Sequence, residues 1–419
     1  MKIAVIGGGV SGLTTAYLLR HAHQVELFER DSRFGGHANT VLVPGPDGEE
    51  IPLDVGFIVF NQRTYPGFTR LLNELGVPSR RSNMSFSVRC DVHDLEYSSR
   101  GIRGYLAQLR NLLRPSHARM MVDLLRFHYD AKRAIANDTM HDVSFGEYLR
   151  TRHFSADFQR HLIVPLTAAT WSNAPADIVR FPANYLFRFL RQHGVLAPGE
   201  IPEWRWVEGG SRQYVQRILQ MLPEGSMHRG ESPVAIRRGD RGVTLAFADD
   251  TERRFDAVVF ACHADDALAL LADPSADEVT TLGGFRFAPN HVVLHTDERL
   301  LPTRARARAS WNYYSTQCST DLQTLTMSYD LNLLQGFAGG PRFCVSVNPG
   351  AMVARERVIA EFDYAHPVYS VDTLEAQRRM EAMNGARSTF FAGAYLGYGF
   401  HEDGVQSAVR VAQRLGVAW

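Results

Sequence analysis

The chain begins with alternating apolar and glycine-rich segments. Residues 2–6 (KIAVI) form a short, continuous apolar run, which is typical of a strand buried on both faces. A glycine-rich turn occupies residues 7–12, and residues 13–22 (LTTAYLLRHA) have the composition of a helix. Residues 24–28 (QVELF) then predict a second strand, which is followed by the acidic residue Glu29. The predicted order is therefore strand, glycine turn, helix, strand and acid.

The pattern changes along the rest of the chain. Residues 102–193 predict a largely helical region in which prolines separate the helices. Alternating apolar and polar positions over residues 233–250 predict a small antiparallel sheet. No apolar stretch approaches the ~20 residues of a membrane-spanning helix. Glycines interrupt the first apolar run and no charged segment of any length precedes it, so we do not expect a signal peptide.

The first turn has the spacing Gly7-x-Gly9-x-x-Gly12. Gly7 permits a tight turn, Gly9 lets the backbone approach a pyrophosphate, and Gly12 lets the helix pack closely on the strand. The free N–H groups and the positive dipole end at the start of the helix attract phosphate. Glu29 is placed to accept hydrogen bonds from ribose hydroxyl groups. A glycine-rich turn alone is weak evidence, but with the strand, helix and acid in register it predicts dinucleotide binding.

A second glycine pair favours FAD over a nicotinamide cofactor. Gly35 and Gly36 follow Glu29 closely and would let a second loop lie against an extended cofactor. Arg33 adds positive charge that suits a pyrophosphate. The alternative interpretation of the pair is an ordinary turn. His37, which follows the pair, is a candidate phosphate contact, and its alternative role is a hydrogen bond to a backbone carbonyl.

Composition limits the class of protein. A chain of 419 residues is long enough for two or three domains. The net charge of zero argues against a nucleic-acid partner. The four cysteines lie far apart without a Cys-x-x-Cys pair, so we expect a reduced, cytoplasmic chain with neither a disulfide framework nor a metal site; they are Cys90, Cys262, Cys318 and Cys344.

The segment from Glu29 to Gly36, with the pattern Glu-x-x-x-Arg-x-Gly-Gly, resembles the second signature of the flavin amine-oxidase superfamily. That superfamily includes amine oxidases, protoporphyrinogen oxidase and phytoene desaturases. More closely, the chain resembles bacterial FAD-dependent oxidoreductases associated with cyclopropane-fatty-acid-synthase-like enzymes, and the N-terminal domain of plant cyclopropane fatty acid synthases. The stretches that carry this resemblance run from residue 1 to near 415 and include GFIVFNQRTYPGF, WRWVEGGSRQYV and GYGFHEDG.

The resemblance implies an α/β fold, with a Rossmann-like FAD-binding domain of the glutathione-reductase or amine-oxidase type. It also implies a discontinuous α+β substrate domain that contains a helical subdomain. We expect the FAD-binding domain to comprise residues 1–60, 205–272 and 385–419. The substrate domain would comprise 61–204 and 273–384, with 102–193 mostly helical.

The resemblance also implies particular contacts to FAD. Val234 would contact the adenine side through its backbone, and Gly393 and Ala394 would lie along the pyrophosphate and ribityl chain. Gly404 and Val405 would start the last helix beneath the flavin pyrimidine ring. The FAD would be noncovalent, since no cysteine stands where some relatives attach it. The expected cofactor-binding residues are Gly7, Gly9, Val10, Ser11, Gly12, Glu29, Arg30, Arg33, Gly35, Gly36, His37, Gly56, Phe57, Val234, Gly393, Ala394, Asp403, Gly404 and Val405.

His401 and Glu402 are the candidates for acid/base catalysis near the flavin. The alternative is structural: both would satisfy backbone groups where the last helix begins, with Asp403 as its cap. Some relatives place a lysine near the flavin, but Lys2 and Lys132 are the only lysines here, which weakens the amine-oxidase interpretation. Candidate substrate-lining aromatic residues, each of which could equally be core, are Trp311, Tyr313, Tyr329, Tyr395, Tyr398 and Phe400.

These features predict an FAD-dependent oxidoreductase. The first hypothesis is a dehydrogenase or desaturase of a fatty acyl chain, methylated or not, free or in a phospholipid, with hydride transfer to flavin N5. The alternatives are a flavin amine oxidase and a non-redox flavin-dependent isomerase. Residues 100–133 hold eight arginines and lysines against two aspartates, interleaved with apolar residues. This pattern fits either a peripheral contact with anionic lipid or a solvated helical face over the core.

Overall fold

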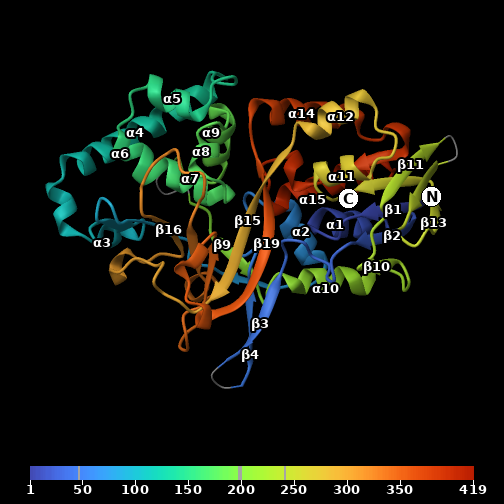
Figure 1. The fold of residues 1–419 in the computed structure, drawn as a ribbon, viewed down its shortest axis with the longest axis horizontal. Coiled ribbons are helices and arrows are strands. Elements are labelled where there is room, and N and C mark those ends of the chain that lie inside the picture. The colour runs from blue at the N-terminus through green and yellow to red at the C-terminus, as the bar shows by residue number, and fades with distance from the viewer. Residues whose placement is uncertain (46–47, 197–200, 240–241) are drawn as a thin grey trace.

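The computed structural model describes residues 1–45, 48–196, 201–239 and 242–419. Figure 1 shows two lobes, one built around a parallel sheet and one that combines a second sheet with a group of helices. Two long strands, β15 (Arg286–His295) and β19 (Val358–Val368), run side by side between them. The chain crosses between the lobes several times, so each lobe is assembled from separated segments.

The first lobe is built on a five-stranded parallel sheet with the order β10-β2-β1-β14-β20. The apolar run of β1 is continuous because both faces of this sheet are covered. Ile3 and Val5 pack with one core cluster, which includes helices α1 and α15, and Ala4 and Ile6 pack with another beneath an antiparallel layer. The elements are β1 (Lys2–Ile6), α1 (Val10–Leu19), β2 (Gln24–Glu29), β10 (Met227–Arg229), β11 (Ala235–Gly239), β12 (Gly242–Ala246), β13 (Glu252–Phe255), β14 (Ala257–Phe260), β20 (Thr389–Phe391) and α15 (His401–Arg414).

The second lobe contains a seven-stranded sheet with the order β19-β15-β18-β17-β16-β7-β8. Its neighbouring strands are antiparallel except for β16 and β7, which are parallel. The further strands of this sheet are β7 (Phe86–Cys90), β8 (Leu95–Ser98), β16 (Trp311–Ser315), β17 (Met327–Asp330) and β18 (Cys344–Val347). The mixed directions indicate an α+β lobe, which agrees with the expected fold class.

Helices cover one side of this sheet (Figure 1). Prolines stand at the first turn of several of them, where a missing N–H costs little. Among the residues that the structure describes, none of the helices is both long enough and apolar enough to span a bilayer. The helices are α3 (Gly101–Tyr105), α4 (Pro115–Ala136), α5 (Phe145–Thr151), α6 (Ala156–Phe158), a π-helical turn (Gln159–Ile163), α7 (Val164–Trp171), α8 (Pro175–Ile178) and α9 (Ala183–Gln192).

Three of the remaining helices correct the expected domain boundaries. We expected α2, α12 and α14 in the substrate domain, but their apolar faces pack into the cores on the parallel sheet. The remaining elements are β3 (Thr40–Pro44), β4 (Glu50–Asp54), β5 (Phe60–Asn61), α2 (Pro66–Glu74), β6 (Ser79–Arg81), β9 (Trp204–Val207), α10 (Arg212–Met221), α11 (Ala264–Leu270), α12 (Ala276–Gly283), α13 (Leu331–Gln335) and α14 (Val371–Met383).

The cysteines correct a second expectation. Cys90 and Cys318 are 228 residues apart in sequence, yet the sheet places their Cα atoms 6.1 Å apart and they form a disulfide. Strands β7 and β16 pair in parallel, so the ends of both strands meet at the same edge. Cys262 and Cys344 are free. Spacing along the chain could not show this pairing, because it depends on how the two strands are aligned.

A buried histidine between β15 and β18 predicts sensitivity to acid. His295 Nδ1 accepts a hydrogen bond from the Asp297 N–H at 3.0 Å, and Nε2 donates to Ser346 Oγ at 2.7 Å, so the ring is neutral. Burial lowers its pKa to about 4. The unfolded chain takes up this proton below about pH 6.5, so the stability that His295 contributes is present above that pH and is lost as the pH falls toward 4.

The free energy of unfolding of the wild type should fall between pH 7.5 and pH 5 because of this histidine. In His295→Asn we expect that fall to be smaller by about 2 kcal/mol. Chemical denaturation at the two pH values measures this difference. His291→Asn is the matched control, because His291 lies on the same strand but is exposed. An unchanged pH dependence in His295→Asn would contradict the assignment of a neutral buried ring.

Candidate functional site

A cavity of about 1320 Å³ joins the two lobes. It exceeds the ~300–1,000 Å³ of ordinary small-molecule pockets, so it has room for a dinucleotide and a second ligand. One end is lined by the two glycine loops and the other by apolar side chains of the sheet and helices of the second lobe. We refer to these ends as the glycine end and the apolar arm.

The first glycine loop has the geometry that its spacing predicts. Gly7 has a φ of +108°, and its N–H donates to Phe28 O at 2.8 Å, which extends the pairing of β1 with β2 to the start of the turn. A Cβ on Gly12 would lie 1.9 Å from Gly7 O, so the helix packs against the turn through bare backbone. A Cβ on Gly9 would meet no protein atom within 4 Å, because Gly9 faces the cavity. Val10 and Ser11, also in the lining, begin α1 without a side-chain cap, so their end of the helix is available to an anion.

The second glycine loop lies directly on the first. The Gly35 N–H donates to Gly8 O at 2.8 Å, and a Cβ on Gly36 would lie 3.2 Å from Gly9 Cα. Both glycines have positive φ values, which other residues rarely adopt. The pair is therefore more than an ordinary turn: it completes a groove of backbone at the glycine end.

Glu29 stands at the end of β2 and lines the same groove. Its carboxylate accepts hydrogen bonds from the Gly8 N–H at 2.7 Å and the Asp31 N–H at 2.8 Å. Burial raises the pKa of the carboxyl group despite these bonds. The remaining lone pairs are positioned to accept hydrogen bonds from the hydroxyl groups of a ribose.

Three buried polar atoms at or near this end have no hydrogen-bond partner in the described protein. They are Arg33 Nη1, His37 Nε2 and the Tyr395 hydroxyl, and all three residues line the cavity. Arg33 is held in place because its Nη2 donates to Gly36 O at 2.7 Å. The His37 ring stacks on Tyr364, with 4.7 Å between the ring centroids, and burial lowers its pKa well below the usual range. Unpaired buried polar atoms are costly, so their presence fits a bound polar ligand such as a dinucleotide.

The other expected cofactor residues mostly reach the cavity. Arg30 forms an ion pair with Asp266 at 3.0 Å and lines the glycine end. The Val234 N–H donates to Ala246 O at 2.8 Å, so this donor is not free for an adenine ring. A Cβ on Gly56 would lie 2.2 Å from His37 O, so Gly56 permits close packing of two loops. Phe57, Gly393 and Ala394 also belong to the lining.

The start of the last helix corrects the expected position of its first residue. Helix α15 begins at His401, not at Gly404, because Asp403 Oδ2 accepts the Phe400 N–H at 2.9 Å and so caps the helix one turn earlier. A Cβ on Gly404 would lie 2.6 Å from Val10 Cγ1, and Val405 is fully buried. Asp403, Gly404 and Val405 therefore hold α15 against α1 and the neighbouring core, and they are absent from the described lining of the cavity.

Glu402 binds the backbone at the start of another helix. Its two carboxylate oxygens accept the N–H groups of Gly67 at 3.0 Å and Phe68 at 2.9 Å, which lie in the first turn of α2. Glu402 is also missing from the described lining of the cavity. These contacts favour the structural alternative for Glu402, because its carboxylate caps a helix supplied by a distant part of the chain.

We expect Glu402→Ala to lower the free energy of unfolding by about 1–3 kcal/mol, because it leaves two helix N–H groups without acceptors. FAD content should be unchanged. Glu402→Gln is the matched control: it keeps a carbonyl oxygen for one of these N–H groups and should lose less. Denaturation curves and the flavin-to-protein ratio measure both effects. A fall in turnover without a fall in stability would restore a catalytic role.

His401 differs from its neighbour because it lines the cavity. Its ring stacks on Phe57, with 3.5 Å between centroids, and Nε2 lies 3.1 Å from the Tyr214 hydroxyl. Burial lowers its pKa to about 3. His401 is therefore a neutral hydrogen-bonding group at physiological pH.

The six candidate aromatic residues separate into two groups. Trp311, Tyr329, Tyr395 and Phe400 line the cavity, and Trp311 contacts Tyr329 edge-on in the apolar arm. Tyr313 lies in the core instead, and Tyr398 packs on Tyr185, so both are wrong as lining residues. Tyr395 packs on Phe285 close to the glycine end.

Much of the apolar arm was not predicted. It includes residues from helices α4, α7 and α9, from the loop before β7 and from β9, for example Met84, Leu124, Leu166, Thr170, Phe189 and Trp204. The acidic residues among the described lining are Glu29, Asp31, Asp266 and Asp363. The first three lie at the glycine end, and Asp363 is exposed and paired with His291. Among the residues that the structure describes, no acidic side chain therefore lines the apolar arm.

Comparison with known proteins agrees with this site. The model of the family described as flavin containing amine oxidoreductase matches residues 10–343. A coproporphyrinogen III oxidase of Mycobacterium leprae is 29% identical over 184 residues, which are 42% of this chain and 38% of that relative. The chain thus spans well under half the length of this curated relative.

Solved structures share the whole fold at low identity. A fatty acid isomerase from P. acnes that produces CLA has a TM-score of 0.69 and 17% identity, covering 99% of this chain and 98% of that one. A putrescine oxidase bound to putrescine has a TM-score of 0.71 and 13% identity, covering 99% of both chains. The family model covers more than half of the chain, so the chain belongs to the flavin-containing amine oxidoreductase family, and the glycine loops and Glu29 fit FAD as its cofactor.

Proposed function

We propose that this enzyme oxidises a fatty acyl chain, free or in a phospholipid, that occupies the apolar arm. The observation that carries the proposal is the composition of that arm, in which apolar and aromatic side chains surround the space and the described acids lie elsewhere. A cationic amine would lack a carboxylate partner there, whereas an acyl chain gains about 0.8 kcal/mol for each buried methylene. Among the proteins of similar fold, the one named a fatty acid isomerase supports a ligand of this class.

The residues of this chain bind and enclose the substrate. Bound FAD supplies the acceptor for a hydride equivalent from a substrate C–H bond. Trp311 and Tyr329 from the sheet and Leu166 from α7 form apolar walls that exclude water and hold the acyl chain. His401, with a pKa of about 3, takes up a proton poorly at neutral pH. Its role is therefore a hydrogen bond from a neutral ring at the junction of the glycine end and the arm.

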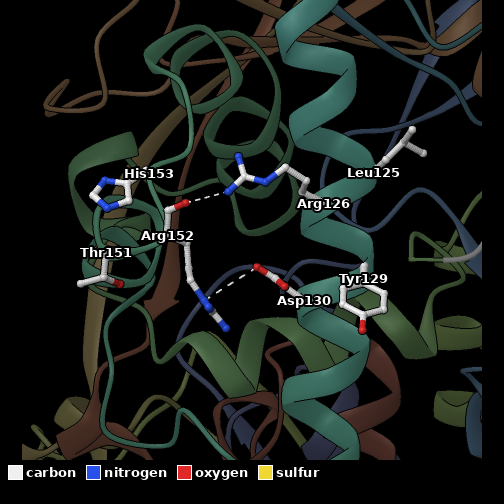
Figure 2. A pocket seen from close by; sticks show the side chains of 7 residues that line it. All are labelled: Leu125, Arg126, Tyr129, Asp130, Thr151, Arg152 and His153. Carbon is white, nitrogen blue, oxygen red and sulfur yellow. Dashed lines mark hydrogen bonds and ion pairs between the residues drawn. The ribbon is translucent and has the colours of Figure 1, made fainter.

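The surface above the arm suits a lipid membrane. Leu124 and His128 of α4 line the cavity, while Leu125 and Tyr129, the next residues, are each 66% exposed. Figure 2 shows Arg126 and Asp130 on the side of α4 that faces Arg152, and Leu125 on the other. The exposed apolar residues of this region, which we call the α4 surface, are Ile102, Leu109, Leu113, Val122, Leu125 and Tyr129.

Arginines alternate with the apolar residues of the α4 surface along the sequence, and Arg103, Arg110 and Arg119 are exposed. Apolar side chains next to cations are the combination that binds the boundary of an anionic bilayer. This arrangement supports peripheral membrane contact, through which an acyl chain would reach the arm beneath α4.

We expect the double variant Leu109→Asp/Leu113→Asp to bind phosphatidylglycerol vesicles at least about tenfold more weakly, because two apolar contacts are replaced by repelled charges. Cosedimentation measures the binding. Val279→Asp on α12 is the control, since Val279 is 47% exposed but lies in the other lobe. Equal vesicle binding by the wild type, the double variant and Val279→Asp would contradict the proposed membrane contact.

Anaerobic mixing of the FAD-loaded enzyme with possible substrates tests the function. The substrates are vesicles of phospholipids with methylated or unmethylated acyl chains, the free fatty acids, and putrescine as the amine. We expect bleaching of the visible flavin absorption by an acyl substrate and none by putrescine. Rapid bleaching by putrescine, or no bleaching by any lipid, contradicts the proposal. An acyl product of unchanged mass that forms only after the flavin is reduced would identify an isomerase instead.

A further inference from the structure

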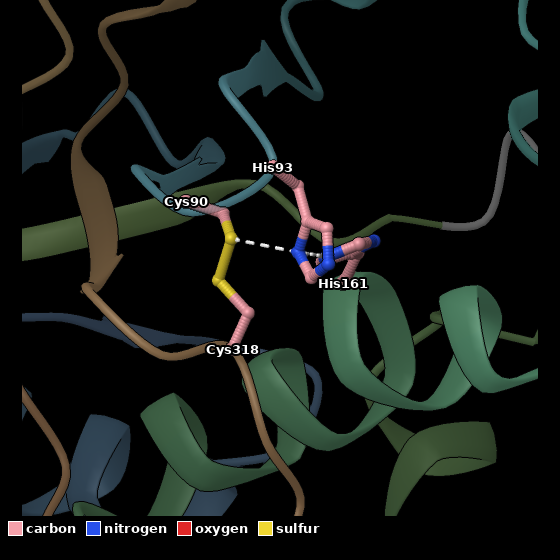
Figure 3. A group of neighbouring side chains, drawn as sticks. All are labelled: Cys90, His93, His161 and Cys318. Carbon is pink, nitrogen blue, oxygen red and sulfur yellow. Dashed lines mark hydrogen bonds between the residues drawn. A yellow bond between two sulfur atoms is a disulfide. The ribbon is translucent and has the colours of Figure 1, made fainter.

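Four metal-binding side chains meet at the β7–β8 edge of the seven-stranded sheet. Cys90 ends β7, His93 lies in the turn to β8, His161 lies in the π-helical turn, and Cys318 follows β16. Their ligating atoms all lie within 4.8 Å of one another (Figure 3). We infer that, when both cysteines are reduced, these side chains bind one Zn²⁺ ion.

The four ligating atoms already surround a common point. His93 Nδ1 lies 3.0 Å from His161 Nε2 and 3.2 Å from Cys90 Sγ. In a tetrahedral site with metal bonds of about 2.0–2.3 Å, neighbouring ligand atoms are about 3.3–3.8 Å apart. The nitrogens and this sulfur therefore need to separate by only a few tenths of an ångström. The Cα atoms of Cys90 and Cys318 are 6.1 Å apart, so both sulfurs can reach the same ion.

The ligand set selects the metal. Two thiolates balance the charge of Zn²⁺, and two imidazoles complete the four ligands of a structural zinc site. Cys90, Cys318 and His161 are each at most 4% exposed, which leaves little room for water as a ligand. None of the four belongs to the lining of the cavity, in keeping with a closed structural site.

An acidic side chain lies behind the His161 ring. Asp157 Oδ1 lies 3.7 Å from His161 Nδ1, the ring nitrogen that faces away from His93, and Arg160 Nε donates to the same carboxylate at 2.9 Å. A carboxylate behind a histidine is the usual second support of a zinc ligand. The Tyr97 hydroxyl donates to the His161 carbonyl at 2.6 Å, and the residue sits in a π-helical turn, a feature frequent at functional sites.

The site would join three separate parts of the second lobe. It links the edge of the sheet, the helical region and the loop after β16. Tyr97 and Leu162, which adjoin His161, line the apolar arm. The ion would therefore stabilise one wall of the arm without touching the substrate.

The metal-binding form differs from this structure by two electrons, because Cys90 and Cys318 are joined here. A phosphine reductant supplies them: the S–S bond breaks, two thiols form, and the phosphine takes oxygen from water to become its oxide. Binding of Zn²⁺ then releases the two thiol protons.

The experiment uses the full chain with bound FAD, purified in phosphine reductant and free of any affinity tag. Elemental analysis after addition of Zn²⁺ and gel filtration should find about one zinc per chain. Replacement of Zn²⁺ by Co²⁺ should give the thiolate-to-cobalt charge-transfer band and the visible bands of a tetrahedral site. Reduced, flavin-loaded wild type that takes up neither metal overturns the inference.

Variants locate the ion. Cys90→Ser and His161→Gln should each lower the zinc content to about a tenth or less, since losing one ligand weakens a four-ligand site strongly. Cys344→Ser is the matched control, because Cys344 is a buried thiol elsewhere in the same sheet. The flavin-to-protein ratio reports folding in each variant independently of the metal. Full zinc content in Cys90→Ser also overturns the inference.

Discussion

Replacing Gly12 by valine is expected to abolish FAD binding and to prevent stable folding of the first lobe. A Cβ at this position would lie 1.9 Å from Gly7 O and 3.0 Å from Gly7 C, which are backbone atoms of the turn after β1. Side chains that are forced into a filled site cost about 1–3 kcal/mol even when neighbouring side chains can move, and this backbone is fixed by the bond from the Gly7 N–H to Phe28 O. The flavin-to-protein ratio and the yield of soluble protein measure the loss.

Two matched alanine variants separate folding from cofactor binding. Gly9→Ala should fold normally, because its Cβ meets no protein atom, but it should bind FAD at least about tenfold more weakly, since that methyl group enters the cavity. Gly283→Ala adds a methyl group in open space at the end of α12 and should change neither property. Normal FAD affinity in Gly9→Ala would show that the cofactor does not approach the backbone at this glycine.

The sequence predicted the glycine end well because its signals are local. The turn, the helix start and Glu29 lie within residues 7–29, and their spacing alone determines how they meet. The close packing of Gly36 on Gly9 joins segments only 27 residues apart. A short separation of this kind leaves few alternative arrangements.

The last helix shows where a local signal was misjudged. The sequence suggested a helix start at Gly404-Val405, but Asp403, the third residue of the helix, accepts the Phe400 N–H and so places the start at His401. The helix therefore includes His401 and Glu402. The acceptor role of Glu402 toward α2 could not be predicted, because Gly67 and Phe68 are more than 330 residues away in sequence.

The apolar arm and the cysteine–histidine cluster could not be predicted for the same physical reason. The residues of the arm are ordinary apolar positions of α4, α7 and α9, and the sequence does not distinguish a helix face that lines a cavity from one that fills a core. Cys90 and Cys318 become neighbours only through the parallel pairing of β7 with β16. The sequence of neither strand indicates which distant strand it pairs with in parallel.

Filling the apolar arm is expected to remove activity on long acyl chains while leaving the cofactor bound. Leu166 is half-buried in α7 and lines the arm, and Leu166→Trp would displace three or four methylene groups of a bound chain. At about 0.8 kcal/mol for each buried methylene, kcat/KM should fall by about 100-fold. Rates of flavin reduction under anaerobic conditions, measured for acyl substrates of increasing length, test this result.

The dependence on chain length is what distinguishes a filled arm from general damage. A short acyl substrate does not reach the displaced space, so Leu166→Trp should oxidise it at close to the wild-type rate, and FAD content should be unchanged. Leu166→Ala is the matched control, because it enlarges the arm at the same position and loses only the contacts of one side chain. It should lower kcat/KM for long chains less than Leu166→Trp does, since no part of the bound chain is displaced. An equal loss for every chain length in Leu166→Trp, or no loss for the longest, would show that the substrate does not occupy the arm.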